Sequence, residues 1–355
     1  DVYRKLQYFM KSNISSKMNY EEAIVKIESE RNKDCPKFTQ KNEIKVKYDL
    51  EIIIPVYNTE QYLEECIESV LTQATRYSFG ITIVNDGSTD NSSKILQTYS
   101  DRENIKIIHQ QNSGLSSARN SALKEINGRY IMFLDSDDKL LPDAIESLMN
   151  VAKNKNADMV AGGYEEFSEK QVLNKISMSD CVLKKEPFEI PGFACMKIFR
   201  AELVDEFCFP ENFLYEDTVI SKLLYYNCKN VYVVPEIIYG YRIRSGSISS
   251  THDVKCIDTF WITKYCLEES VKRGYSLDKY TYKEYLKQCY INYLRTRYLS
   301  EELQESLFIL TADMLNGHWK DTYIKGSNKF KMLDQALKKR SYKAYCYILE
   351  RWELL

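Results

Sequence analysis

The sequence predicts an α/β fold with a mostly parallel sheet, followed by an all-helical C-terminal region. Short apolar runs alternate with amphipathic helical segments between residues 50 and 161, and a helical pattern dominates residues 255–355. Strands joined by helices of this length form parallel sheets with right-handed crossovers. Ligands of such sheets bind beyond the carboxyl ends of the strands, so a site is expected there.

The expected strands and helices alternate regularly. Strands are expected at 50–57, 79–85, 105–109, 130–134 and 158–161, and helices at 60–72, 89–100, 115–125 and 142–153. Proline ends the first strand at Pro55 and suits the first turn of a helix at Pro142. The helix at 60–72 is typical of the set, because Leu63 and Ile67 share its apolar face.

Three regions are expected along the chain. Residues 1–48 form a basic arm with a helix at 20–30 and a linker at 33–47, or else a solvated extension. Residues 49–253 form the α/β domain, whose last third is expected to be irregular, and residues 254–355 form a helical domain. Tyrosines alternate with Lys and Arg in this helical domain. That pattern leaves three interpretations: a core with a basic face, an interface between copies in a homo-oligomer, or a surface for anionic lipid or a glycan acceptor.

Composition argues against several classes of protein. With 355 residues, of which 44% are hydrophobic, the chain has room for a large core and roughly two domains. A net charge of −2 argues against a nucleic-acid partner, because a general nucleic-acid binder needs a basic field. Ten scattered cysteines without zinc-site spacing indicate reduced thiols in the cytosol.

No apolar run is long enough to span a membrane, and no signal peptide is recognised. We therefore expect a cytoplasmic protein, with peripheral contact at the inner face of the cell membrane left open. The chain begins with Asp1 rather than Met, so a missing N-terminal segment is also left open.

Three acids end the most informative segment of the chain. Asp135, Asp137 and Asp138 directly follow an apolar run that is expected to be a buried strand. A buried strand cannot hold that charge, so the acids are expected at its exposed carboxyl end. Two carboxylates one residue apart on a turning backbone suit Mg²⁺ or Mn²⁺. The alternative is a solvated acidic turn before the helix that starts near Pro142.

Polar motifs also follow the first three predicted strands. They are Pro-Val-Tyr-Asn at 55–58, Asn-Asp-Gly-Ser-Thr-Asp at 85–90 and Gln-Asn-Ser-Gly-Leu-Ser-Ser-Ala-Arg-Asn at 111–120. Each motif alone also fits a strand end, a turn or a helix cap. Their convergence with the acids on one edge of one sheet favours a ligand site.

This ordered set of motifs closely resembles the family-2 glycosyltransferases with a GT-A fold, a Rossmann-like nucleotide-sugar-binding domain. The resemblance covers about residues 49–250. It implies a UDP-sugar donor, with contacts from Pro55, Tyr57, Glu60, Asp86, Gly114 and Arg119. Asp86 fits this role physically, because a carboxylate accepts from a uracil N3–H. The alternative for Arg119 is a surface ion pair.

The family's D-x-D motif falls on Asp135 and Asp137, with Ser136 between them at the nucleotide sugar. The resemblance implies that Asp135 contacts the ribose or a metal-bound water, and that Asp137 binds Mn²⁺ or Mg²⁺ on the diphosphate. Such a cation neutralises the charge that builds on the leaving nucleoside diphosphate.

Glu216 and Asp217 match the family's E-D segment. In inverting members its Asp is the general base, which implies that Asp217 takes the proton of the acceptor hydroxyl. The alternative is that both acids simply begin a helix at 218–226, because acids suit a helix N-terminus.

Two further segments carry basic residues. Lys197 and Arg200 lie in a short element that resembles one on the family's acceptor side, although both also suit a structural role. Arg242 and Arg244 lie in a segment that resembles the family's closing loop. The resemblance implies that they reach the diphosphate, with Gly246 as a hinge.

The resemblance implies an inverting transferase that moves a hexose or N-acetylhexosamine to a glycan, lipid-linked or protein-linked acceptor. Its role would be bacterial surface polysaccharide or glycoprotein biosynthesis. A sugar-phosphate nucleotidyltransferase is an alternative, but Tyr-Asn-Thr-Glu at 57–60 replaces the expected Gly-rich loop. A catalytically silent nucleotide-binding subunit is another, although the acids at 135, 137 and 217 argue against it. A dehydrogenase is excluded because no G-x-G-x-x-G follows the first strand.

Overall fold

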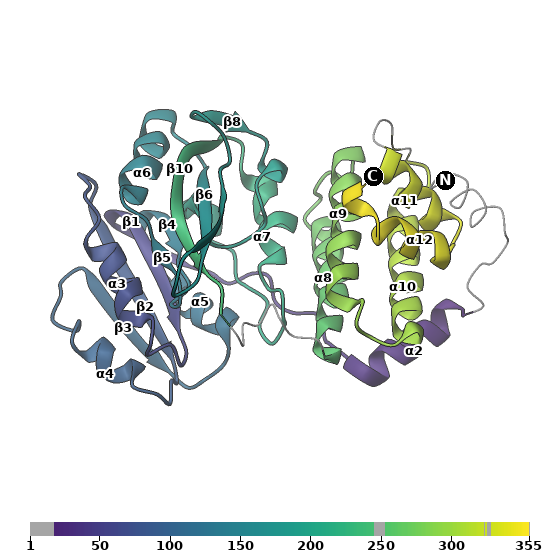
Figure 1. The fold of residues 1–355 in the computed structure, drawn as a ribbon, viewed down its shortest axis with the longest axis horizontal. Coiled ribbons are helices and arrows are strands. Elements are labelled where there is room, and N and C mark those ends of the chain that lie inside the picture. Colours follow the sequence, from purple (N-terminus) through teal and green to yellow (C-terminus); the bar gives the residue numbers. More distant parts are fainter. Residues whose placement is uncertain (1–17, 245–252, 323, 325–327, 355) are drawn as a thin grey trace. The chain divides into compact units, whose positions relative to one another are not determined.

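A computed structural model describes residues 18–244, 253–322, 324 and 328–354. The chain divides into two compact units (Figure 1). The sheet unit comprises residues 36–247. The helical unit combines residues 1–35 with residues 248–355.

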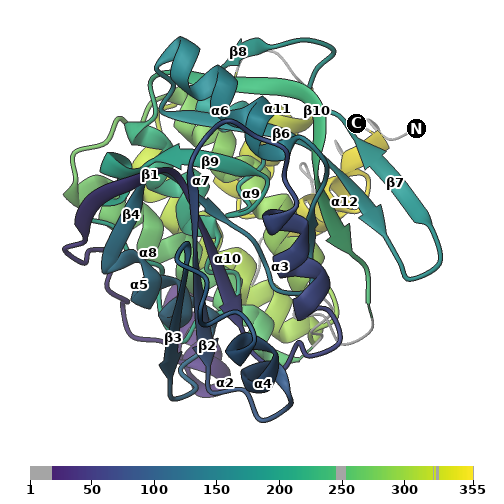
Figure 2. The ribbon, with the colours of Figure 1, turned by 90° about the vertical axis from the view of Figure 1, so that its left-hand side faces the viewer.

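One mixed sheet organises the sheet unit (Figure 2). Its strand order is β3-β2-β1-β4-β9-β6-β10-β5. These strands are β1 (Glu43–Val56), β2 (Phe79–Asp86), β3 (Ile105–Gln110), β4 (Glu125–Phe133), β5 (Lys139–Leu140), β6 (Met159–Phe167), β9 (Lys197–Arg200) and β10 (Val231–Arg242). Two more strands pair at its side: β7 (Val172–Ile176) with β6, and β8 (Leu183–Lys185) with β10. The predicted α/β class is confirmed.

The four strands β1 to β4 pair with one another in parallel. β1 lies between β2 and β4, and β3 continues the set beyond β2. The β1 residues from Leu50 to Val56 are all buried, as expected for a central strand covered on both faces. Val56 lies beside Asn85 and Ile53 beside Phe133, so the carboxyl ends of these strands meet at one edge.

Helices join and cover these strands. They are α3 (Leu63–Leu71), α4 (Ser92–Gln97), α5 (Leu115–Leu123), α6 (Ala144–Lys155) and α7 (Thr218–Lys222). α5 packs against β1, β2 and β4, whereas α6 packs against β6 and β10. α5 begins at the edge where the strands end, which brings its side chains close to the predicted site.

The structure differs most from the predicted elements at the start of β1 and after residue 165. The first strand begins at Glu43, within the linker expected at 33–47, because its early residues pair with Glu125 and Ile126 of β4. The irregular region expected after residue 165 contains four strands, β9 and β10 among them. Pro235 lies inside β10 where the pairing with β6 shifts register. A proline inside an apolar run argues against a strand, which is why the sequence pattern hid β10.

The helical unit contains α2 (Tyr20–Arg31), α8 (Asp258–Lys272), α9 (Lys279–Thr296), α10 (Glu301–Trp319), α11 (Asn328–Lys338) and α12 (Tyr342–Leu349). α2 packs on α10 and buries Ala23 and Ile27. Arg31 makes two 2.8 Å hydrogen bonds to the fully buried carboxylate of Asp258. The helix expected at 20–30 is therefore a packed element of this unit, whereas residues 36–48 belong to the sheet unit.

No helix in the described part of the chain combines the length and apolar character that crossing a bilayer requires.

Candidate active site

The three acids begin where the ladder of β4 stops. Leu134 makes the last pairing bond, from its N–H to the carbonyl of Ile53 at 3.0 Å. The chain then turns, and the N–H of Asp138 donates to the carbonyl of Asp135 at 3.0 Å. Asp135 and Asp137 keep part of their side chains exposed, as predicted for acids at a strand end.

Arg119 connects this turn to the distant E-D segment. From α5, its Nη2 donates to Oδ1 of Asp135 at 2.9 Å, and its Nη1 donates to Oε1 of Glu216 at 2.7 Å. The guanidinium is buried and lies 5.2 Å from the ring centroid of Phe209. Arg119 is thus a buried bridge rather than half of a surface ion pair.

Burial and charge act in opposite directions on this bridge. Burial lowers the pKa of Arg119, but Asp135 and Glu216 outweigh it, so the pKa lies above its ordinary value. Burial raises the pKa of Glu216, and the Arg119 charge only partly opposes that shift. Arg119 therefore stays charged and ties the two acidic segments together.

Two arginines of the β10 end approach Asp137. Nε of Arg244 donates to Oδ2 of Asp137 at 2.7 Å, and Nε of Arg242 donates to the Asp137 carbonyl at 2.7 Å. The Arg242 guanidinium lies 4.6 Å from the ring centroid of Tyr62 and 4.5 Å from that of Phe167. Both arginines thus lie at Asp137, and their predicted contact with the diphosphate stays a prediction. Gly246 and the loop around it lie outside the described residues.

Asp138 has a structural role. It is buried and accepts from Tyr239 Oη and from the N–H of Arg242, both at 2.7 Å. Burial, reinforced by Asp135 and Asp137, raises the pKa of Asp138 to about 8. This carboxyl joins the turn after β4 to β10.

Asp86 connects the end of β2 to the start of α5. Its Oδ1 accepts from the N–H of Ser113 at 2.9 Å and from Gln110 at 2.7 Å, and its Oδ2 accepts from the N–H of Gly114 at 2.8 Å. Gly114 has a φ of +89°, which places it in the region that glycine tolerates best. In the structure Asp86 therefore holds the turn before α5 by hydrogen bonds, whereas the sequence predicts that it contacts the nucleobase.

The remaining predicted nucleotide contacts lie near the end of β1. Pro55 is buried in the strand, whereas Tyr57 is 49% exposed. Oε2 of Glu60 accepts from the N–H of Asn91 at 2.7 Å, which joins the segments after β1 and β2. Ser136 Oγ accepts from Thr59 at 3.0 Å and links the ends of β1 and β4. Tyr57 is thus the most accessible of these side chains.

Asp217 is the residue from which α7 starts. The residue before the E-D pair, Tyr215, has a φ of +62°, and Met196, just before Lys197, has a φ of +67°. Such left-handed conformations are costly for residues other than glycine and cluster at functional sites. Both strained positions are next to candidate site residues.

Lys197 is fully buried. Its Nζ donates to the carbonyls of Pro191, at 2.7 Å, and of Phe193. Burial lowers the pKa of Lys197 to about 7, while Asp217 acts in the opposite direction. The resemblance implies an acceptor-side position for Lys197, with a structural role as the alternative, and the sequence did not reveal these two hydrogen bonds.

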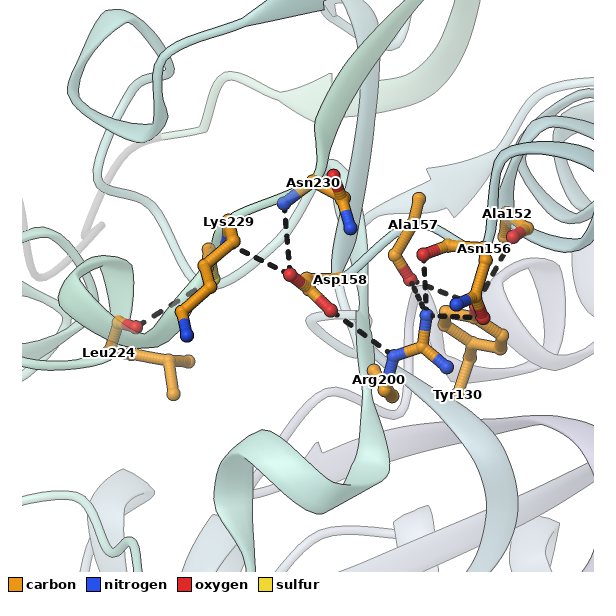
Figure 3. A network of polar contacts seen from close by, with 10 residues as sticks. Tyr130, Ala152, Asn156, Ala157, Asp158, Arg200, Leu224, Lys229 and Asn230 are labelled. Carbon is orange, nitrogen blue, oxygen red and sulfur yellow. Dashed lines mark hydrogen bonds and ion pairs between the residues drawn. The ribbon is translucent and has the colours of Figure 1, made fainter.

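Arg200 belongs to a different network (Figure 3). It donates to Oδ1 of Asp158 at 3.3 Å and to the carbonyl of Ala157 at 2.7 Å. The other oxygen of Asp158 accepts from the N–H groups of Lys229 and Asn230 at 2.8 and 2.9 Å. This network holds the segments that enter β6 and β10, so Arg200 is structural.

Within the described ranges, no three His, Cys, Asp or Glu side chains cluster in a way that could hold a metal ion. Oδ2 of Asp135 and Oδ1 of Asp137 have no hydrogen-bond or ion-pair partner among the described residues. Two carboxylate oxygens are therefore available at this turn.

Comparisons with known proteins found related sequences and a similar fold. The family described as Glycosyl transferase family 2 matches residues 51–224. The chain is 34% identical over 218 residues to glycosyltransferase GlyA of Streptococcus pneumoniae, covering 56% of this chain and 31% of that protein. It is 30% identical over 225 residues to glycosyltransferase GlyG of the same organism, covering 57% of this chain and 73% of that protein. The chain thus spans less than a third of GlyA but most of GlyG.

A solved structure shares the fold. Residues 1–349 of TarS from S. aureus, in complex with UDP-GlcNAc, superpose with a TM-score of 0.69 at 19% identity. The match covers 86% of this chain and 92% of that one. At this identity the likeness concerns the fold.

Proposed function

Since the chain belongs to glycosyltransferase family 2 and has the GT-A fold, we propose that it is an inverting glycosyltransferase. The proposed reaction moves a hexose or N-acetylhexosamine from a UDP-sugar to a hydroxyl of a glycan, lipid-linked or protein-linked acceptor. The observation that carries the proposal is the Arg119 bridge, which joins Asp135 at the donor end to Glu216 beside Asp217. A UDP-sugar donor is also supported by the fold neighbour TarS, which was solved with UDP-GlcNAc and with UDP.

Asp135 and Asp137 fit a divalent cation, Mn²⁺ or Mg²⁺. Each has one carboxylate oxygen without a partner among the described residues, and hard oxygen donors suit these ions. When bound, the cation would offset charge on the leaving diphosphate. Arg242 and Arg244 lie at the same turn, so their positive charges would act on the same group.

Asp217 is the proposed general base. Its carboxylate would accept the proton of the acceptor hydroxyl while that oxygen bonds to the anomeric carbon. The bond from that carbon to the UDP oxygen breaks, and UDP leaves with the electron pair. Attack from the opposite face inverts the configuration, so an α-linked donor gives a β-linked product. Lys197 lies within electrostatic range of this carboxylate.

Glu216 and Arg119 are proposed as positioning residues for this step. Arg119 holds Glu216, and Glu216 precedes the base in the chain, so the bridge sets the distance between donor and acceptor sides. A role in surface polysaccharide or glycoprotein biosynthesis, a homo-oligomer formed through the C-terminal helices and a peripheral membrane contact stay predictions.

The test is UDP release from a panel of UDP- and GDP-sugars with Mn²⁺. Wild type and Asp143→Asn are expected to hydrolyse one UDP-sugar slowly, whereas Asp137→Asn and EDTA-treated enzyme are not. Asp143 is a matched control, because it is an exposed acid with no side-chain capping bond, and Asn tolerates its left-handed backbone. Pyrophosphate release would instead indicate a nucleotidyltransferase. UDP binding without turnover, even with acceptor extracts, would indicate a silent subunit.

A further inference from the structure

Two buried polar side chains hold the loop at 190–193 from inside. Lys197 Nζ donates to the carbonyls of Pro191 and Phe193, and Tyr225 Oη donates to the same Pro191 carbonyl at 2.7 Å. Both donor side chains are almost wholly excluded from solvent. Burying an ammonium group is expensive, so a buried lysine that binds two carbonyls of one loop marks a loop whose position matters.

The loop lies against the helix that begins at the proposed base. A Cβ on Gly192 would lie 3.0 Å from Oγ of Ser221, which is in α7. The Lys197 charge that holds the loop also acts on Asp217, from which α7 starts. The loop therefore lies against α7, the helix that starts at the proposed base.

Phe193 projects from this clamped loop. Its side chain is 43% exposed, although its carbonyl is fixed by Lys197. The rings of Tyr164 and Phe193 form a T-shaped pair, with 6.5 Å between ring centroids and 82° between ring planes. A single exposed apolar side chain is ordinary on a protein surface. Here a buried lysine binds the Phe193 carbonyl, and a second aromatic ring packs against the Phe193 ring.

We propose that Phe193, supported by Tyr164, is a platform on which a pyranose ring of the acceptor stacks. One face of a pyranose carries axial C–H bonds and packs on an aromatic face, while the ring's hydroxyls stay free to reach Asp217. A rigid ring binds with little loss of conformational entropy, because its side chain has few rotatable bonds. Lys197 is a positioning residue that acts through the loop. The inference rests on the proposed function, since it assigns the acceptor side of the same site.

The choice of a pyranose follows from the size of the platform. One exposed ring with one supporting ring matches the face of a single sugar, whereas a lipid chain requires a longer continuous apolar surface. An open-chain polyol lacks the flat C–H face. The platform should therefore distinguish cyclic from open-chain acceptors.

The experiment uses the full chain with defined probes. The cyclic probes are methyl β-D-glucopyranoside and methyl N-acetyl-β-D-glucosaminide, and the open-chain probe is ribitol. Binding is read by saturation-transfer NMR in wild type and by fluorescence in Phe193→Trp. The three native tryptophans (Trp261, Trp319 and Trp352) are all buried in the helical unit. A change in fluorescence on adding sugar to Phe193→Trp can therefore be assigned to position 193. Tyr280→Ala is the matched control, because Tyr280 is 66% exposed in α9. UDP affinity is measured for every variant.

The proposal expects wild type and Phe193→Trp to bind at least one pyranoside, and Phe193→Ala to bind it about tenfold more weakly with unchanged UDP affinity. Tyr280→Ala should behave as wild type, and ribitol should bind to none. Three results would overturn the proposal: pyranoside binding that is equal in Phe193→Ala, ribitol binding as tight as pyranoside binding, or no pyranoside binding by wild type. Loss of UDP binding by wild type would refute the proposed donor instead, so the two failures are distinguishable.

Discussion

Arg244 donates to Asp137 at 2.7 Å, so the carboxylate proposed to bind a cation is already paired with a positive side chain. Both side chains are partly exposed, with 33% and 23% of their surface accessible. An incoming cation and this guanidinium compete for the same carboxylate. Once nucleotide is present, the diphosphate offers Arg244 a second acceptor.

Replacing Arg244 separates these effects. We expect Arg244→Ala to bind Mn²⁺ roughly threefold more tightly without nucleotide, because a partly exposed ion pair contributes little. The same change should weaken UDP binding. Electron paramagnetic resonance of Mn²⁺ and calorimetry with UDP measure the two affinities, with Arg76→Ala as control, since Arg76 is exposed and pairs with Glu146. Unchanged Mn²⁺ affinity would show that the Arg244 contact does not compete with the cation.

The Arg119 bridge predicts a large loss of stability. Arg119→Met removes the partner of two acids, Asp135 and the largely buried Glu216, and leaves their charges uncompensated. We expect the free energy of unfolding to fall by about 3–5 kcal/mol in urea titrations. Arg119→Lys should recover only part of it, because one ammonium lacks the planar fork that binds both acids. A full recovery by lysine would contradict the bridging role.

Asp217 is expected to act in the chemical step alone. Asp217→Asn should lower sugar transfer by about 10²- to 10⁴-fold while UDP affinity stays as in wild type. Asp205→Asn is the control, since Asp205 is an exposed acid of the same unit. Transfer is followed by chromatography of the product, and NMR of the anomeric proton reports its configuration. Transfer that survives in Asp217→Asn would reject this base, and a retained configuration would reject inversion.

Lys197 predicts a dependence of stability on pH. Its pKa in the folded protein is about 7, below its ordinary value, so the unfolded chain binds the extra proton between pH 7 and the ordinary pKa of lysine. Stability therefore rises with pH across this window and gains nothing below it. Relative to that of Lys197→Met, the free energy of unfolding of wild type should rise by on the order of 1.4 kcal/mol per pH unit above pH 7. Urea titrations from pH 6 to 9 measure this difference, and parallel pH profiles would show that Lys197 stays charged in the fold.

Local patterns predicted much of the fold correctly. Apolar runs and amphipathic segments are short-range features, so the strands from β1 to β4 and the helices between them were recognisable. The helix at 20–30 was found for the same reason. β10 was missed because Pro235 interrupts its pattern, and the short β9 is defined by its partners β4 and β6.

Candidate residues could be named more readily than their roles. Asp135 and Asp137 were recognisable because charge directly after a buried strand has few structural explanations. The bracing role of Asp86 and the aromatic contacts of Arg242 had no comparable signal, since their partners are distant in the chain or are backbone groups.

The sequence by itself determined the α/β class, the helical C-terminal region and the acids at the carboxyl ends of the strands, because all depend on neighbouring residues. Tertiary structure alone decided that Arg119 joins Asp135 to Glu216 and that Lys197 holds the loop carrying Phe193. The physical reason is burial. A charged side chain becomes a bridge or a clamp only when the fold removes it from water and supplies the partners that offset the cost.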